Sequence, residues 1–283
     1  MTTKTIAITG ATGQFGAIAL DLLKAKQANV IALVRSPEKI SGAAARQFDY
    51  SKTKGQVEAL QGVDTLILVS SSEVGQRIQQ HKNVIEAAKK AGVKHIIYTS
   101  LLGATNDNTV KSLAGEHVET ESALKASGIT YTILRNGWYT ENYTASIPAA
   151  LANNAFYGSA KNGKISSVLR AELAEAAVNV ALSEGHENQT YELAGSTSWT
   201  LADLAAEISK QTGKDIPYVD IPAADYAAAL VQAGLDEGFA GLIAQWDVDA
   251  SNGALFSEDK TLDKLLGRPT AGLDVAVKQA LSH

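Results

Sequence analysis

Three glycines at three-residue spacing follow an apolar, alternating run near the start of the chain, in TIAITGATGQFG (residues 5–16). The run predicts a buried strand, and FGAIALDLLKAK has apolar residues at helical spacing. Gly10 would permit the tight turn, Gly13 the close approach of a pyrophosphate, and Gly16 close packing of helix against strand. Free N–H groups at the helix start and the helix dipole favour a phosphate there. The spacing differs from the commoner G-x-G-x-x-G, so a tight turn without a nucleotide is the alternative.

The second predicted strand, VIALVR (residues 30–35), ends in a basic residue. An NAD site has an acidic residue here, about twenty residues after the turn, to bind the ribose 2′-hydroxyl. Arg35, with Lys39 in RSPEK, would instead bind a 2′-phosphate through charge-assisted hydrogen bonds. Asp49, after a short third strand around Phe48, would reach the adenine amine. The predicted cofactor is NADP(H), while a solvated Arg35 and an Asp49 that caps its own loop are the alternatives.

Many short-chain dehydrogenases protonate the substrate oxygen with a tyrosine and a lysine four residues later on one helix face. The helix predicted after the fifth strand, SLAGEHVETESALKASG, contains no tyrosine. Tyr50 and Lys54 have the spacing, but they follow the third strand, away from the expected nicotinamide end. Tyr157 and Lys161 have it too, but the glycines and the Asn-Gly pair around them predict a turn. The usual acid–base pair is therefore absent.

The same helix offers weaker candidates for proton transfer. His117 and Glu121 are spaced i, i+4, within side-chain reach, so His117 could orient the nicotinamide ribose or supply a proton. A histidine tied to a neighbouring carboxylate is the alternative. Ser100, at the end of the fifth strand, takes the place of the usual catalytic serine, or else caps a turn. The five histidines have no HExxH or paired spacing and there are no cysteines, so no metal site is predicted.

Strand-like and helix-like patterns alternate through the first half of the chain and must position these residues. Further apolar strands are DTLILVS, KHIIYTS and TYTILRN, and the helices between them are RIQQHKNVIEAAKKAG and GEHVETESALKASG. Apolar strands separated by amphipathic helices indicate a parallel sheet that is covered on both faces. The predicted fold is therefore an α/β doubly wound Rossmann fold.

In the second half of the chain the alternation changes. TYELAG predicts a strand near residues 190–194 that returns to the main sheet, and Thr200 is the expected cap of the helix WTLADLAAEISKQTG, with Asp203 in its first turn. We therefore expect an NADP-binding Rossmann domain over residues 1–137 and a small C-terminal α/β lobe over 138–283. Because ligands bind beyond the carboxyl ends of the strands, such a lobe would shape a substrate cleft.

The balance of charge and the hydropathy exclude some partners. With 25 basic and 30 acidic side chains the formal net charge is −5, and no basic block interrupts it, so nucleic acid is not expected. No uncharged apolar run reaches the roughly 18 residues of a membrane span. We expect the first strand to begin near Lys4, and therefore no signal peptide before it. We expect a cytoplasmic protein without disulfides, and the sequence leaves a homo-oligomer open.

Several stretches together resemble one family. AITGATGQFG, LVRSPEK, LVSSSEVGQR, AAGVKHIIYTSL and TILRNGWYTENY resemble the NAD(P)H:quinone oxidoreductases of the atypical short-chain, NmrA-like type, with triphenylmethane reductases a close second. The resemblance continues through GHENQTYELAGSTSWTLADLA to LLGRPTAGL, and SSSEVGQR and RNGWYTENY favour the quinone enzyme. It implies an NADPH-dependent reductase that works without the tyrosine–lysine pair.

The resemblance also implies where the ligands bind. It places the segment from Gly137 to Asn142 near the nicotinamide, and Trp138, Tyr139 and Tyr143 would stack on a planar substrate. The alternative for the aromatic residues is packing within the lobe. The alternative for Ser70–Ser72 is that they cap a helix before Glu73 and do not contact the cofactor. The full predicted cofactor set is Gly10, Thr12, Gly13, Gln14, Phe15, Gly16, Arg35, Asp49, Ser70, Ser71, Ser72, Gly137, Trp138, Tyr139 and Asn142.

A quinone substrate would explain the missing acid. The reduced quinone is a delocalised oxyanion that water can protonate, so the task is to hold C4 of the nicotinamide against the ring. Lys164 and Arg170 would offset charge at the reduced oxygen, or else make surface or lobe contacts. The leading hypothesis is an NADPH-dependent quinone reductase that could also accept dyes. The rivals are a non-catalytic NADP-binding regulator of the NmrA type, with an apolar patch for a protein partner, and a sugar-nucleotide epimerase, which needs the absent pair.

Overall fold

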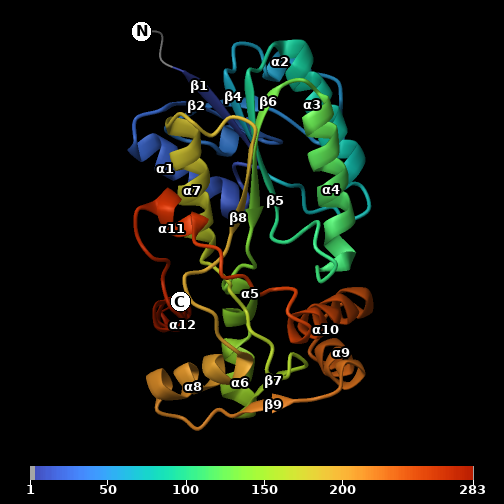
Figure 1. Ribbon diagram of the computed structural model, residues 1–283, viewed down its shortest axis with the longest axis vertical. Coiled ribbons are helices and arrows are strands. Elements are labelled where there is room, and N and C mark those ends of the chain that lie inside the picture. Colours follow the sequence, from blue (N-terminus) through green and yellow to red (C-terminus); the bar gives the residue numbers. More distant parts are fainter. Residues whose placement is uncertain (1–3, 283) are drawn as a thin grey trace. The chain divides into compact units, whose positions relative to one another are not determined.

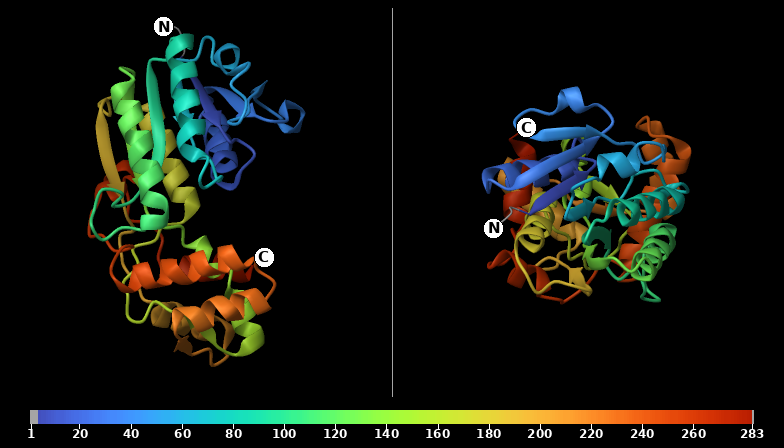
Figure 2. Two further views of the ribbon diagram at one scale, coloured as in Figure 1. Left: turned by 90° about the vertical axis from the view of Figure 1, so that its right-hand side faces the viewer. Right: turned by 90° about the horizontal axis from the view of Figure 1, so that it is seen from above.

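A computed structural model of the chain describes residues 4–282, which form two compact units. The first unit contains the residues up to 104 together with 113–136 and 170–192. The second contains 105–112, 137–169 and the residues from 193 onward. Figure 1 labels their helices and strands, and Figure 2 gives two further views. Beyond residue 137, residues 170–192 return to the first unit. They contain a helix as well as the strand predicted near residues 190–194.

Over the described residues, the first unit is built on a seven-stranded sheet with the order β3-β2-β1-β4-β5-β6-β8. Strands β1 to β6 pair in parallel. The order reverses between β1 and β4, and ligands of such sheets bind outside the carboxyl ends of the strands at that point. The strands are β1 (Thr5–Thr9), β2 (Asn29–Val34), β3 (Ala44–Gln47), β4 (Thr65–Leu68), β5 (His95–Leu101), β6 (Thr130–Asn136) and β8 (Gln189–Leu193).

Helices cover both faces of this sheet (Figure 1), which confirms the predicted doubly wound Rossmann fold. On one face α1 (Gln14–Ala25) packs against α7 (Arg170–Leu182), and on the other lie α3 (Arg77–Ala91) and α4 (Lys111–Ala126). The short helices α2 (Gln56–Ala59) and η1 (Pro37–Lys39) lie in connections. The core on the α3–α4 side combines aliphatic residues of the strands with the buried ring of Tyr98.

The second unit has its own small parallel sheet, in which β7 (Phe156–Gly158) pairs with β9 (Tyr218–Asp220). Thr200 caps α8, because its side chain accepts the Asp203 N–H while the Asp203 carboxylate accepts the Thr200 N–H. The predicted cap is therefore confirmed. The helices of this unit are α5 (Glu141–Thr144), α6 (Ile147–Asn153), α8 (Leu201–Thr212), α9 (Ala223–Gln232), α10 (Glu237–Ser251), α11 (Thr261–Leu266) and α12 (Leu273–Leu281).

The start of α3 differs from one interpretation of the sequence. The serines Ser70–Ser72 do not cap a helix at Glu73, because α3 begins only at Arg77 and has no side-chain cap. Between Ser72 and Arg77 the chain turns, and Gly75 has a φ of +88°, which is not a helical conformation.

Two further boundaries also differ. Tyr157 lies on β7 rather than in a turn, and the turn comes later, at Lys161, whose φ is +50°. The third strand ends at Gln47, one residue before Phe48. Both differences arise because strand pairing with distant segments, which local residue types do not reveal, decides where these short strands end.

Candidate active site

The turn after β1 is closed by its own backbone. Gly10 has a φ of +61°, which side chains disfavour, and its carbonyl accepts the Gly13 N–H at 2.8 Å. A Cβ on Gly16 would lie 2.2 Å from the Gly10 carbonyl oxygen, and one on Gly13 would lie 3.3 Å from it. The turn therefore needs glycine at Gly10 for its conformation and at Gly16 for close packing of α1 against β1.

The start of α1 presents backbone donors without a competing acceptor. Its first turn has no side-chain cap and no acidic residue, so its N–H groups and the positive end of its dipole are not neutralised locally. Thr12 and Gln14 are exposed beside these donors, while the Phe15 side chain is buried. The turn and the helix start thus fit a pyrophosphate.

Two exposed cations follow β2. Arg35 lies directly beyond the last residue of the strand, and Lys39 ends η1. Asp49 is turned toward its own loop: its Oδ1 accepts the Ser51 N–H at 2.9 Å, and its Oδ2 lies 3.8 Å from Lys52 Nζ. This geometry favours the loop-capping interpretation of Asp49, whereas the 2′-phosphate role of Arg35 stays a prediction.

The segment after β4 is held by buried side chains that the sequence analysis did not single out. The Ser71 N–H donates to His81 Nε2 at 3.0 Å, and the Ser71 carbonyl accepts from Arg77 Nε at 2.8 Å. Arg77 is only 6% exposed and pairs with Glu116 at 3.2 Å, and Glu116 also accepts the Gly75 N–H. Together these contacts fix the loop at the carboxyl end of β4, next to the strand that carries the glycine turn.

The serines of this loop have different environments. The Ser70 N–H donates to Thr99 Oγ1 at 2.8 Å, and Ser72 is exposed. Ser71 is buried, and its hydroxyl has no hydrogen-bond partner. The Ser71 hydroxyl is thus the one of the three that a bound group would satisfy.

The contacts of His81 fix its protonation. A backbone N–H can only donate, so Nε2, which accepts from Ser71, carries no proton. The proton of the neutral ring is then on Nδ1, which lies 3.1 Å from Thr120 Oγ1, and Thr120 donates onward to the Glu116 carbonyl. Burial, with the nearby Arg77 cation, lowers the pKa of His81 to about 3. His81 is a neutral structural acceptor and not a proton donor.

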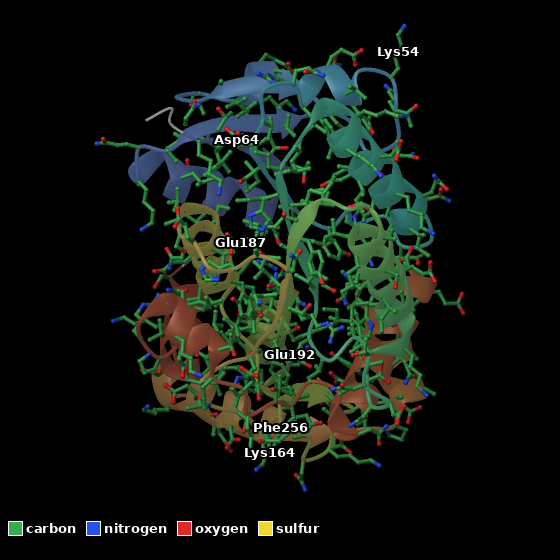
Figure 3. All side chains as sticks on the ribbon, turned by 45° about the horizontal axis from the view of Figure 1, so that its top comes forward. Lys54, Asp64, Lys164, Glu187, Glu192 and Phe256 are labelled. Carbon is green, nitrogen blue, oxygen red and sulfur yellow. The ribbon has the colours of Figure 1, made fainter. Side chains whose placement is uncertain are left out.

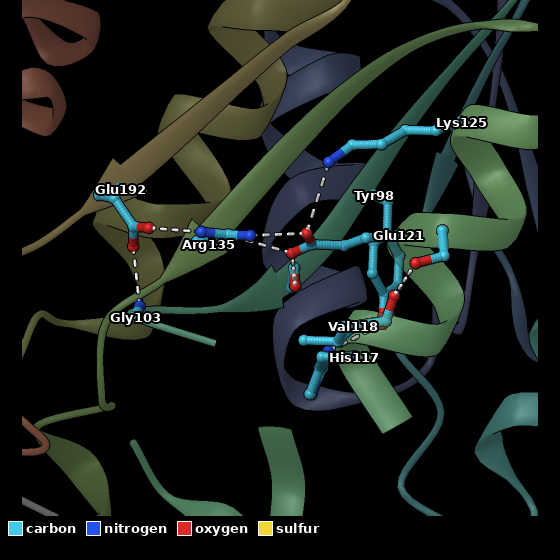
Figure 4. A network of polar contacts seen from close by, with 10 residues as sticks. Tyr98, Gly103, His117, Val118, Glu121, Lys125, Arg135 and Glu192 are labelled. Atoms are coloured by element: carbon cyan, nitrogen blue, oxygen red, sulfur yellow. Dashed lines mark hydrogen bonds and ion pairs between the residues drawn. The ribbon is translucent and has the colours of Figure 1, made fainter. Parts of the chain in front are cut away.

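Ser100 adjoins a network of ion pairs in which Arg135 binds both Glu121 and Glu192 (Figure 4). Its Oγ donates to Glu121 Oε1 at 2.6 Å, and Arg135 binds both Glu121 oxygens, at 2.9 and 2.8 Å. Arg135 also pairs with Glu192 at 2.8 Å, whose other oxygen accepts the Gly103 N–H. The Ser100 proton is thus committed to a carboxylate that already has a cation, which favours a structural role over catalysis.

His117 does not pair with Glu121 in the structure. Its Nδ1 lies 2.8 Å from the hydroxyl of Tyr98, and the two rings are 5.9 Å apart in the core (Figure 4). Burial lowers the pKa of His117 to about 3 and raises the pKa of Tyr98 far above its ordinary value. At neutral pH His117 is uncharged, so its position favours packing and not proton donation.

Tyr50 is also bound within the first unit. Its hydroxyl lies 2.6 Å from Thr9 Oγ1 and 2.5 Å from the Val69 carbonyl oxygen, and burial raises its pKa. Lys54, four residues on, is exposed and extends away from the ribbon (Figure 3). Tyr50 and Lys54 are therefore not arranged as an acid–base pair.

The segment that follows β6 belongs to the second unit. Gly137 has no room for a side chain, because its Cβ would lie 2.7 Å from the Leu193 carbonyl oxygen. Trp138 and Tyr143 are each 8% exposed; Trp138 packs edge-on against Trp246, and Tyr143 against Trp199.

The neighbours of these two rings are more accessible. Tyr139 is half-buried, and its backbone bridges to Val168. Asn142 is exposed on α5. Of the three aromatic residues predicted to stack on a substrate, Tyr139 is the least buried.

Lys164 lies on the surface of the second unit. Its Nζ is 5.6 Å from the centre of the Phe256 ring, and both residues are exposed (Figure 3). Arg170 begins α7 in the first unit. The contact with Phe256 favours the surface interpretation of Lys164.

Asn136, the last residue of β6, is a functional candidate that the sequence analysis missed. It is 4% exposed, and neither its Oδ1 nor its Nδ2 has a hydrogen-bond partner. An asparagine at a strand end is common, so only its burial and its missing partners single it out.

Across residues 4–282, no group of three or more His, Cys, Asp or Glu side chains is arranged to hold a metal ion. Within the same residues, no helix is long and apolar enough to cross a bilayer.

Comparison with known proteins identifies the family. Residues 10–184 match a family model described as NAD(P)H-binding. The chain is 53% identical over 279 residues to quinone oxidoreductase 2 of Escherichia coli (strain K12), covering 96% of this chain and 97% of the relative. It is 32% identical to an NmrA-like family domain-containing oxidoreductase of Aspergillus flavus, covering 97% of this chain and 94% of that one.

Solved structures give the same grouping. The crystal structure of an NADPH-dependent quinone oxidoreductase from Escherichia coli complexed with NADPH matches with a TM-score of 0.93 and 51% identity, over 98% of this chain and 99% of the other. Triphenylmethane reductase of Citrobacter sp. matches with a TM-score of 0.93 and 36% identity, over 99% and 100%. The chain therefore belongs to the NAD(P)H-binding family and, within it, to the NmrA-like oxidoreductases.

Proposed function

We propose that this protein is an NADPH-dependent oxidoreductase that transfers a hydride to a quinone. The observation that carries the proposal is the 53% identity, over nearly the whole length of both chains, with quinone oxidoreductase 2 of Escherichia coli. The first unit supports it, since a glycine turn, an uncapped helix start and an exposed arginine lie at the carboxyl ends of β1 and β2.

NADP(H) would be held mainly by the backbone of the first unit. The turn from Gly10 and the first N–H groups of α1 would bind the pyrophosphate, and Arg35 would bind the 2′-phosphate. Ser71, whose buried hydroxyl has no partner, would contact the cofactor from the end of β4. When bound, the cofactor supplies a hydride from C4 of its nicotinamide.

The chain does not need to supply a proton donor for this reaction. A quinone that accepts a hydride becomes a quinolate, whose charge is spread over the ring, and water supplies the proton that completes the hydroquinone. The states of His117 and Ser100 agree with this, because His117 is neutral at pH 7 and the Ser100 proton is bound by Glu121. The residues act by holding the reactants in a near-attack geometry.

A planar aromatic substrate would stack on Tyr139, the least buried aromatic residue of the segment Gly137–Tyr143. Trp138 and Tyr143 are less suited to this role, because they are buried against Trp246 and Trp199 of the second unit. The same surface suits cationic dyes of similar shape, in agreement with the 36% identity to triphenylmethane reductase.

The proposal is tested by following the reduced-nicotinamide absorbance of NADPH with purified protein and a small benzoquinone. Controls omit the protein, omit the quinone, or replace NADPH with NADH. We expect protein-dependent oxidation that saturates in quinone and is faster with NADPH. If NADPH binds but neither quinones nor triphenylmethane dyes speed its oxidation, the proposal is wrong and the protein is a dinucleotide-binding regulator.

A further inference from the structure

The side-chain amide of Asn136 is buried at the end of β6. A buried amide has one acceptor and one donor group to satisfy, and leaving either unpaired is unfavourable. Native proteins have few such groups, so each one calls for a partner. In Asn136 both the Oδ1 and the Nδ2 are unpaired.

The backbone around this amide is fixed. Asn136 pairs with Leu101 in the register of β5 and β6, and its carbonyl accepts the Leu102 N–H at 2.9 Å. The preceding side chain, Arg135, binds Glu121 of α4. Because side chains alternate along a strand, Asn136 is turned to the opposite face of the sheet, the face covered by α1 and α7.

This position lies in the nicotinamide half of the fold. In a doubly wound sheet the dinucleotide crosses the carboxyl edge at the reversal of strand order, with one mononucleotide over each half of the sheet. Arg35 marks the adenosine half, at the end of β2. Asn136 ends β6, in the other half, and shares its sheet face with α1, whose start fits the pyrophosphate.

The polarity of the unpaired atoms selects the ligand group. A quinone oxygen only accepts hydrogen bonds, so it would satisfy Nδ2 and leave Oδ1 unpaired. A primary carboxamide offers a carbonyl oxygen and an N–H side by side and would satisfy both atoms. The geometry points to Asn136 as the residue that binds the carboxamide of the nicotinamide. This inference rests on the cofactor part of the proposed function.

The experiment is a cycle that changes both the residue and the carboxamide. Isothermal titration calorimetry measures three ligands on wild type and on Asn136→Leu: NADP⁺, its 3-acetylpyridine analogue, and 2′-phospho-ADP-ribose. The analogue replaces the carboxamide NH₂ with a methyl group, and the third ligand has no pyridine ring. Asn136→Ala repeats the series, so that the result does not depend on one variant being stable.

We expect wild type to bind NADP⁺ about tenfold more tightly than the acetylpyridine analogue, because one hydrogen bond is lost. In the Asn136 variants this preference disappears, while the affinity for 2′-phospho-ADP-ribose is unchanged. Without ligand, Asn136→Leu melts at a higher temperature than wild type, because an unsatisfied amide has been removed.

Thr65→Val is the matched control. Thr65 begins β4, is fully buried, and has an unpaired hydroxyl, but it lies at the amino edge of the sheet. It should leave all three affinities unchanged.

Two results would overturn the assignment. One is a variant that keeps the wild-type preference for the carboxamide, which would mean that Asn136 binds a water molecule or only packs. The other is a variant that weakens all three ligands alike, which would indicate a general effect on the fold. If wild-type protein binds neither NADP⁺ nor 2′-phospho-ADP-ribose, the proposed function itself fails together with this inference.

Discussion

At the residue level, we propose that the choice between NADPH and NADH depends on Arg35. It is exposed at the end of β2, where a carboxylate would repel a 2′-phosphate and a guanidinium binds it with paired hydrogen bonds. We expect Arg35→Ala to weaken NADPH binding by about 10- to 100-fold, as for loss of a charge-assisted hydrogen bond, and to leave NADH nearly unchanged. Titration of both cofactors by nucleotide fluorescence measures this.

Lys26→Ala is the matched control for that prediction. Lys26 is also exposed, but it follows the far end of α1, away from the carboxyl edge of the sheet. It should change neither affinity. Equal weakening of NADPH and NADH by Arg35→Ala would show that the arginine is structural and that the 2′-phosphate assignment is wrong.

Gly16 tests the glycine turn itself. A Cβ here would meet the Gly10 carbonyl oxygen at 2.2 Å, so Gly16→Ala must move α1 away from β1. We expect it to destabilise the protein by about 3 kcal/mol in urea denaturation and to reduce NADPH affinity. Gly115→Ala, on the exposed side of α4 with open space around it, should instead stabilise by roughly 0.5–1 kcal/mol. An unaffected Gly16→Ala protein would contradict the close packing.

For single residues, the sequence predicts the conformation that the backbone requires better than it predicts the partners of side chains. Gly10 and Gly16 could be assigned because a tight turn between a strand and a helix imposes local demands. Asn136 could not, since nothing in its own sequence neighbourhood shows that its amide is buried and unpaired. His117 shows the same limit: its i, i+4 spacing suggested Glu121, but the fold gives it Tyr98 from β5.

Among the elements, the loop after β4 depends on α3. His81 accepts the Ser71 N–H and Arg77 binds the Ser71 carbonyl, so both sides of one peptide are fixed by buried side chains. The loop lies at the end of β4, the strand beside β1, and the sheet reverses there. α3 therefore positions a segment that the cofactor would contact.

Removing the imidazole should loosen this loop. We expect His81→Leu to leave the Ser71 N–H buried without an acceptor, which costs about 1–3 kcal/mol of stability. Hydrogen–deuterium exchange should show that the Ser71 amide loses protection, and NADPH affinity should fall. Gln79→Ala, which alters an exposed side chain of the same helix, is the control. Unchanged protection at Ser71 would contradict the role of His81.

The sequence predicts the elements well where their periodicity is strong, and poorly where pairing with another strand sets their boundaries. The long helix α3 ends at Ala91, and Gly92 follows it in the left-handed conformation, as its glycine indicated. Its start at Arg77 agrees with the predicted helix RIQQHKNVIEAAKKAG. The ion pair of Arg77 with Glu116 was not predicted, because it joins two helices that are far apart in the sequence. The short strands β3 and β7 are set by their partners and not by their own residues.

For the whole molecule, buried histidines couple stability to pH. Burial lowers the pKa of His81 and His117 to about 3 and that of His95 to about 4, while the unfolded chain protonates each near 6.5. Their contribution is fully present above about pH 6.5 and is lost as the pH falls toward 3. Asp247 has the opposite effect on stability, because burial raises its pKa to about 6. As the pH falls, the folded state therefore binds a proton at Asp247 before the unfolded state does.

We therefore expect stability to fall by roughly 3 kcal/mol per pH unit near pH 5, since the unfolded state binds about two more protons there. Urea denaturation at pH 7, 6 and 5 measures the slope. Asp247→Asn removes the opposing carboxyl and should steepen it. A stability that does not change between pH 7 and 5 would show that these histidines are not buried as neutral rings.

Hydride transfer from NADPH to a quinone can be observed in a single turnover. Protein loaded with NADPH, or with NADPH deuterated at both C4 positions, is mixed with excess benzoquinone, and the nicotinamide absorbance is followed in time. We expect NADPH to be consumed on the enzyme, and the deuterated cofactor to be consumed more slowly. NADPH that stays bound and unoxidised in the presence of quinone would contradict it.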